Sequence, residues 1–249
     1  MAVLPTQVDQ VDHAASDGSA GLIDLCEVFA RPSLYLDPEL VQPYLAVIGI
    51  DLTEDDPELP PEWVDEVFFD HLMARLSALP EADWTLALNL SHANSVVPLI
   101  ATAPSHVITQ FAIAAAAACL QEPIGQNVLK RNILHISEIL GPEASKIAFG
   151  EAQFLYQGLG TLGDASNIYH SIFRLDAEHA DAHAGLVNFG QSIIYATLTS
   201  ESRLWAEIFS FRTGPAGFQP AFELKNFSAQ QKNLILRLWK RKWKKWQNS

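Results

Sequence analysis

Apolar residues recur at spacings of three and four along most of this 249-residue chain, a pattern typical of helices with one buried face. The clearest case opens at Pro61 and closes before Pro80, with apolar positions at Trp63, Val64, Val67, Phe68, Leu72, Met73, Leu76 and Leu79. No sustained period-two alternation occurs, and no Asn-Gly or Asp-Gly turn separates two β-rich segments. The spacing therefore predicts an all-α protein, an irregular multi-helix bundle in a single globular domain.

Proline and glycine divide the chain into predicted helices. We expect them near residues 22–29, 38–48, 61–79, 83–90, 95–101, 105–120, 124–140, 143–158, 164–175, 179–198 and 201–209. Pro43 is expected to bend or divide its helix. The apolar run from Phe111 to Leu120 is shorter than the roughly 20 residues that cross a bilayer, so it predicts a buried core helix.

Composition and segment boundaries predict three parts. With 49% hydrophobic and 18% charged residues the chain is globular, and residues 1–19 are a polar, disordered segment before an all-α domain over 20–224. Residues 225–249 form a basic helix.

No secretory signal is visible, so a cytoplasmic location is expected. Cys26 and Cys119 lie in apolar helical segments, which predicts two buried thiols in a reducing compartment.

Charge is distributed unevenly along the chain, whose formal net charge is −13. Residues 1–129 contain nineteen acidic side chains and only Arg31 and Arg75 as cations, whereas residues 225–249 contain eight lysines or arginines and no acid. The sequence thus predicts an acidic body with a basic tail.

The basic tail has the pattern of an amphipathic helix. Ser228 and Gln231 form a capping box, and Ile235, Trp239, Trp243 and Trp246 follow at spacings of four, four and three. The other faces carry Lys232, Arg237, Lys240, Arg241, Lys242, Lys244 and Lys245. As contact residues for a partner or a membrane we select Trp239, Trp243, Trp246, Arg237, Lys240, Arg241, Lys244 and Lys245.

Four interpretations of this helix stay open. It docks on the protein's own acidic body or on an acidic partner, it lies peripherally on an anionic membrane surface, it binds nucleic acid, or it simply packs into the fold with its basic face solvated. Binding of nucleic acid is the weakest, because an acidic body repels phosphates.

Residues that carry chemistry are few. His179 and His183 stand at i and i+4 beside Asp176 and Asp181, a spacing that can hold zinc, although a polar helix start explains it better without an HExxH order. Gly158, Gly160 and Gly163 match G-x-G-x-x-G but follow no strand, so they predict interhelical turns. No nucleophile motif occurs. We therefore expect no catalytic residue, cofactor, metal or small-molecule substrate.

Three motifs resemble a known family. They are Phe29-Ala-Arg-Pro-Ser-Leu-Tyr-Leu-Asp-Pro38, Ile133-Leu-His-Ile-Ser-Glu-Ile-Leu-Gly-Pro142, and Gly185-Leu-Val-Asn-Phe-Gly-Gln-Ser-Ile-Ile-Tyr195 with the later Trp205 and Phe209-Ser-Phe-Arg-Thr-Gly-Pro215. Over residues 25–217 the chain resembles the sorting-platform adaptors of type III secretion systems, SctK (YscK, OrgA and MxiK).

The resemblance implies a non-enzymatic part of a bacterial injectisome. Such adaptors join the pod protein SctQ to the cytoplasmic domain of the inner-membrane ring protein SctD, at the cytoplasmic face of the inner membrane, and so help to recruit the ATPase–stator complex. The runner-up is a helical chaperone for secreted proteins, because residues 148–182 are similar to one tetratricopeptide unit.

Overall fold

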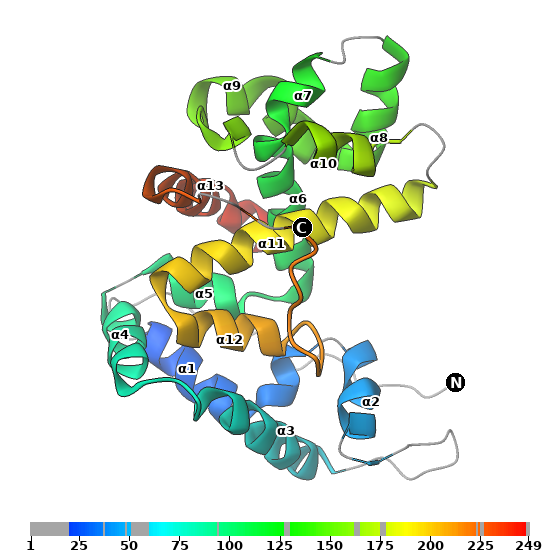
Figure 1. The fold of residues 1–249 in the computed structure, drawn as a ribbon. Helices are drawn as coiled ribbons and strands as arrows, with labels where there is room; N and C mark the ends of the chain where they lie inside the picture. The colour runs from blue at the N-terminus through cyan, green and yellow to red at the C-terminus, as the bar shows by residue number, and fades with distance from the viewer. Residues whose placement is uncertain are drawn as a thin grey trace.

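The computed structural model describes residues 20–36, 38–47, 49–50, 60–93, 95–126, 130–161, 165–174, 178–222, 224 and 227–247. Over these residues the chain forms a single compact all-helical domain without strands (Figure 1), which confirms the predicted fold class. The α-helices are α1 (Ala20–Ala30), α2 (Pro38–Val47), α3 (Pro61–Leu76), α4 (Glu81–His92), α5 (Val96–Thr102), α6 (Ser105–Cys119), α7 (Gln121–Gln126), α8 (Lys130–Lys146), α9 (Ala152–Leu155), α10 (Ala165–Ile172), α11 (His179–Glu201), α12 (Arg203–Phe211) and α13 (Ala229–Gln247). Two 3₁₀ turns, η1 (Pro32–Tyr35) and η3 (Leu159–Thr161), and one π-helical turn, η2 (Ile147–Glu151), complete the set.

Helix α6 is the central element of the bundle. It runs from the group of α1–α5 and α12 toward the group of α7–α10, while α11 crosses it and α13 lies alongside (Figure 1). Every residue from Ala114 to Leu120 is almost completely buried, so the predicted core helix is confirmed. No single helix in the described ranges is long and apolar enough to cross a membrane, whereas α5 and α6 together pass by length and composition, with a 115° bend between them.

The crossing of α6 and α11 is unusually close because Gly190 has no side chain. A Cβ atom placed on Gly190 would lie 2.0 Å from the carbonyl oxygen of Ala112, far inside van der Waals contact. Small residues let two helix backbones approach in this way, and the flanking Phe189 and Ile193 then bury completely.

The first helices pack around α12, whose Trp205, Phe209 and Phe211 are buried. Phe211 lies 5.1 Å from the ring of Tyr44 in α2, measured between ring centroids. Burying a large apolar side chain of this kind contributes about 1.5–3 kcal/mol. Helix α2 is therefore held by a residue that lies more than 160 positions further along the chain.

Local signals account for most helix boundaries. Pro61 is the first residue of α3, Glu62 stands in its first turn and Arg75 in its last, which suits the helix dipole. Ser95 accepts a hydrogen bond from Val97 N and caps α5. Gly141, at φ 73°, ends the regular part of α8 where the sequence predicted an end.

Two expectations need correction. Helix α2 continues through Pro43 as one element, so this proline does not divide it. Cys119 is buried as predicted, but Cys26 is exposed. The reason is its place on α1, where Leu25 and Val28 point into the core and the position between them turns outward.

The close crossing predicts the effect of two matched glycine substitutions in α11. Gly190→Ala should lower the free energy of unfolding by about 3 kcal/mol or more, because the added methyl overlaps the backbone of α6. Chemical denaturation followed by circular dichroism measures this change.

Gly185→Ala is the control, since its Cβ would meet only Ile172 at an ordinary 3.4 Å. Here the lower chain entropy of alanine should stabilise the helix by about 0.5–1 kcal/mol. Equal effects at the two positions would contradict a backbone-to-backbone crossing at Gly190.

Candidate functional site

The basic C-terminal helix α13 is docked on the protein's own body. Its side chains Ile235, Leu238 and Trp239 are completely buried against the bundle. The Trp239 ring lies 4.8 Å from that of Phe111 in α6 and stacks on Trp243 at 5.8 Å, measured between ring centroids. The helix thus packs on the chain's own body with its outer basic face exposed, which agrees with both the first and the fourth interpretation. Contact with an acidic partner, a membrane or nucleic acid stays a prediction.

This placement revises the set of candidate contact residues. A buried tryptophan removes about 150–250 Å² from water, which at about 25 cal/mol per Å² contributes about 4–6 kcal/mol. Trp239 is therefore a core residue and not part of an outer contact surface. Trp243 is half-buried on the same seam, and the side chain of Trp246 lies outside the described residues.

The start of α13 follows the predicted capping box. Ser228 N donates to Gln231 Oε1 at 2.9 Å, and Gln231 N donates to Ser228 Oγ at 3.2 Å. The same glutamine also donates through Nε2 to the carbonyl of Gly158, at 3.1 Å. The box thus both starts the helix and attaches it to the segment after α9.

Part of the basic face pairs with carboxylates of the body. Lys242 Nζ lies 2.7 Å from Glu151 in η2, Lys245 Nζ lies 2.7 Å from Glu143 in α8, and Lys232 pairs with Glu201 in α11. Hydrogen bonds from Lys245 and Lys146 lower the pKa of Glu143 to about 2. The positive charge of the basic tail is therefore partly neutralised, by acidic residues of the segment between 130 and 224.

Four basic residues form a strip on the outer side of α13. Arg237, Lys240, Arg241 and Lys244 are exposed at spacings of three, one and three, which places them on one helix face. We call these four residues the outer basic strip. They are the predicted contact residues that the structure leaves accessible, together with Lys245, which is exposed but paired to Glu143.

A second candidate feature is a buried arginine at the end of α12. Arg212 is only 8% exposed, and its Nε donates to the carbonyl of Tyr35 at 2.6 Å while Nη1 donates to that of Ala101 at 2.9 Å. Its guanidinium lies 6.0 Å from the centre of the Tyr35 ring. One side chain thus connects η1, α5 and α12.

Tyr44 holds the same backbone segment from the other side. Its hydroxyl lies in hydrogen-bonding contact with the carbonyl oxygens of Phe211 and of Gly214, the latter at 2.7 Å. Burial raises the pKa of this phenol, so it stays protonated and can donate. Residues 211–214 are therefore fixed between α2 and the Arg212 contacts.

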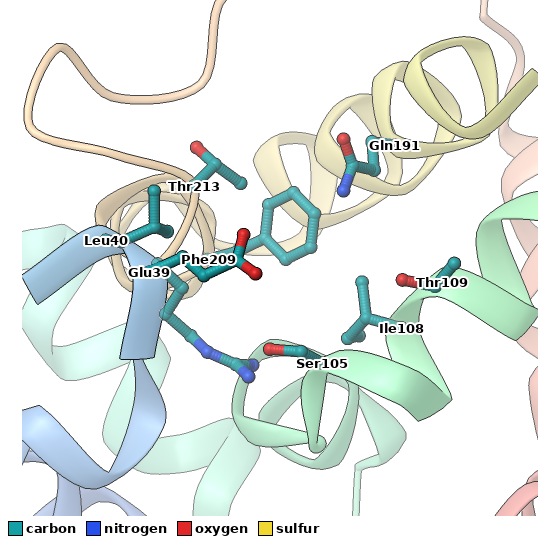
Figure 2. A pocket seen from close by; sticks show the side chains of 9 residues that line it. Glu39, Leu40, Ser105, Ile108, Thr109, Gln191, Phe209 and Thr213 are labelled. Carbon is teal, nitrogen blue, oxygen red and sulfur yellow. The ribbon is translucent and has the colours of Figure 1, made fainter. Parts of the chain in front are cut away.

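A cavity of about 260 Å³ opens beside this junction. Figure 2 shows that its labelled side chains come from α2, α6, α11, α12 and Thr213, the second residue after α12. The lining residues are Glu39, Leu40, Ser105, Ile108, Thr109, Gln191, Phe209, Arg212 and Thr213. Hydroxyls, an amide and a carboxylate on a partly apolar wall can hold a small polar group or a partner's side chain.

His179 and His183, for which the sequence favours a polar helix start over a metal site, have different surroundings in the structure. His183 is exposed on α11 and Asp176 lies outside the described residues, whereas His179 approaches Glu138 and His135 of α8. Of the three glycines that match G-x-G-x-x-G, Gly158 and Gly160 lie in the turns after α9, and Gly163 is outside the described residues. Arg212 belongs to the motif at residues 209–215, but its spacing does not predict the contacts with Tyr35 and Ala101.

The Lys242–Glu151 pair predicts a specific loss of stability. Lys242→Met should cost about 1–3 kcal/mol, because it leaves a partly buried carboxylate without its cation. Lys240→Met, on the exposed face, should change the free energy of unfolding by less than about 0.5 kcal/mol. Urea denaturation of both variants tests this, and equal effects would show that Lys242 does not hold the helix.

Replacing Arg212 should affect packing between distant segments. Arg212→Met leaves the carbonyls of Tyr35 and Ala101 without their donors and should destabilise by about 2–4 kcal/mol. Arg203→Met, at the exposed start of the same helix, is the matched control and should stay within about 0.5 kcal/mol. A midpoint of urea unfolding shared by both variants would contradict the bridging role.

Comparisons with known proteins return nothing for this chain. No family model matches it, and no curated protein and no solved structure shows significant similarity to it. What the resemblance over residues 25–217 implies therefore rests on the quoted motifs and on what their residues do in the fold.

Proposed function

We propose that this chain is a non-enzymatic adaptor of a bacterial type III secretion injectisome. In this role it links an SctQ-like pod protein to the cytoplasmic domain of an SctD-like ring protein, at the cytoplasmic face of the inner membrane. It thereby supports recruitment of the ATPase–stator complex. The proposal rests on the three motifs that resemble the SctK family and on the positions of their residues.

The observation that carries the proposal is the meeting of the first and last motifs. They are separated by about 170 residues in sequence, yet Arg212 of the last motif donates to Tyr35 of the first. Tyr44, which follows the first motif, contacts the carbonyls of Phe211 and Gly214 in the last one. Residues that contact one another to hold a fold together are expected to occur together in proteins of that fold. The contacts between the two motifs therefore support the resemblance to the SctK family.

The other motif glycines also have backbone roles. Gly190 permits the close crossing of α6 and α11, and Gly141 ends the first part of α8 with a positive φ of 73°. Neither role is available to another residue without strain or overlap. These motifs, although mostly apolar, thus contain two positions at which the fold requires glycine.

An adaptor needs two separate surfaces, and the chain has two of opposite charge. Glu62, Glu66 and Asp70 are exposed along α3 beside the partly exposed ring of Phe69, a surface suited to a basic partner. The outer basic strip of α13 suits an acidic partner. Charge of this kind mainly favours rapid and specific encounter between partners.

Co-expression with the SctQ-like and SctD-like proteins of the same genome tests the proposal. We expect a stoichiometric complex with each, and loss of secretion when the gene is deleted. Reversing the outer basic strip (Arg237→Glu, Lys240→Glu, Arg241→Glu and Lys244→Glu) should weaken one of the two interactions at least about tenfold. Binding is measured by calorimetry with purified proteins.

Charge reversal is a sharper test than removal of residues 226–249, because Trp239 lies in the core and truncation would unfold the protein. Arg203→Glu, an exposed cation outside the strip, is the control. Binding to neither protein, with normal secretion in the deletion strain, would contradict the adaptor role. A stable complex with an exported protein instead would support the chaperone.

A further inference from the structure

Two histidines and a glutamate from distant parts of the chain meet at one point of the surface. His135 and Glu138 lie on α8, and His179 is the first residue of α11. One ligand atom from each lies within 4.8 Å of the other two. The segment from η2 to α10 separates the two helices in sequence, so only the tertiary fold brings these side chains together.

The distances are close to those that a metal ion requires. His135 and Glu138 stand at i and i+3, on one face of α8. His179 Nε2 lies 3.5 Å from Glu138 Oε2, and two ligands about 2.1 Å from a tetrahedral ion are about 3.4 Å apart. The rings of His135 and His179 meet edge to face at 5.4 Å between their centroids. The exposed side chains of Glu138 and His179 are free to close the remaining gap to His135 by rotation.

His135 contributes an observation that an ordinary ion pair leaves unexplained. Its Nε2 is shielded from solvent and has no hydrogen-bond partner. The contact between His179 and Glu138 leaves that nitrogen unsatisfied, so the imidazole group of His135 has a capacity for binding that the protein's own contacts do not use.

We propose that His135, Glu138 and His179 bind a divalent transition metal ion, with Zn²⁺ as the best fit. Two imidazole nitrogens with one carboxylate oxygen suit zinc better than calcium or magnesium, which prefer all-oxygen sites. Water completes the coordination. The ion connects the start of α11 to α8, and this role is independent of the adaptor function proposed above.

This set of ligands differs from the His179–His183 pair that helical spacing alone suggests. His183 lies one turn further along α11 and belongs to no cluster of potential ligands in the described ranges. The two histidines therefore make a matched pair of variants, since both are exposed on the same helix. A zinc site at His135, Glu138 and His179 is lost when His179 is replaced and kept when His183 is replaced.

Calorimetric titration of the tag-free, chelator-treated full chain with Zn²⁺ tests the proposal. We expect one ion per chain and a dissociation constant in the micromolar range or tighter. His179→Ala and Glu138→Gln should each weaken binding at least about tenfold, in line with the loss of a ligand. Zinc should also raise the thermal unfolding midpoint of the wild-type protein, because it binds the folded state.

His183→Ala should bind zinc as the wild type does. Circular dichroism confirms that the variants are folded, and the exposure of His179 makes this expected. Absence of saturable binding by the wild type at 1:1 stoichiometry, or an equal loss in His183→Ala and His179→Ala, would overturn the proposal. Titration with Ca²⁺ in place of Zn²⁺ should give no binding, and equal affinity for both would also overturn it.

Discussion

The rest of the structure depends on the contact between the backbones of α6 and α11 at Ala112 and Gly190. Because a Cβ on Gly190 would lie 2.0 Å from a carbonyl oxygen, the two helices approach more closely than side chains normally allow. The alanine-rich face of α6 then leaves room for α8 and α13 around the same axis. One small residue thus sets the spacing of the whole central layer.

Electrostatics explains why an acidic body and a basic tail belong to one chain. The lysines of α13 pair with Glu143, Glu151 and Glu201, which come from three different elements. Exposed pairs contribute little each, so the buried Trp239 supplies most of the attachment and the pairs fix the register. The outer basic strip of α13 and the acidic residues of α3 stay exposed on the surface.

Much of the fold was predictable because local signals decide it. Pro61, the capping box at Ser228 and the apolar run from Phe111 to Leu120 each act within a few residues. The position of α13 and the surroundings of His179 depend on contacts between distant segments, and the spacing of residues along the sequence does not predict such contacts. An amphipathic stripe predicts that Trp239 is buried, but it does not predict that the partner is Phe111 of α6. Helical periodicity places His179 near His183, whereas the tertiary fold also places it beside Glu138.

The bond from Arg212 to Tyr35 has a consequence for synthesis of the protein. These residues are 177 positions apart, and the contacts of Tyr44 span a similar distance. The first three helices leave the ribosome long before α12 is synthesised. Their apolar faces therefore stay exposed to solvent while most of the chain is made. Because Trp239 also lies in the core, final folding is expected only after translation has passed α13, and a nascent chain stalled earlier would be a natural client for holding chaperones.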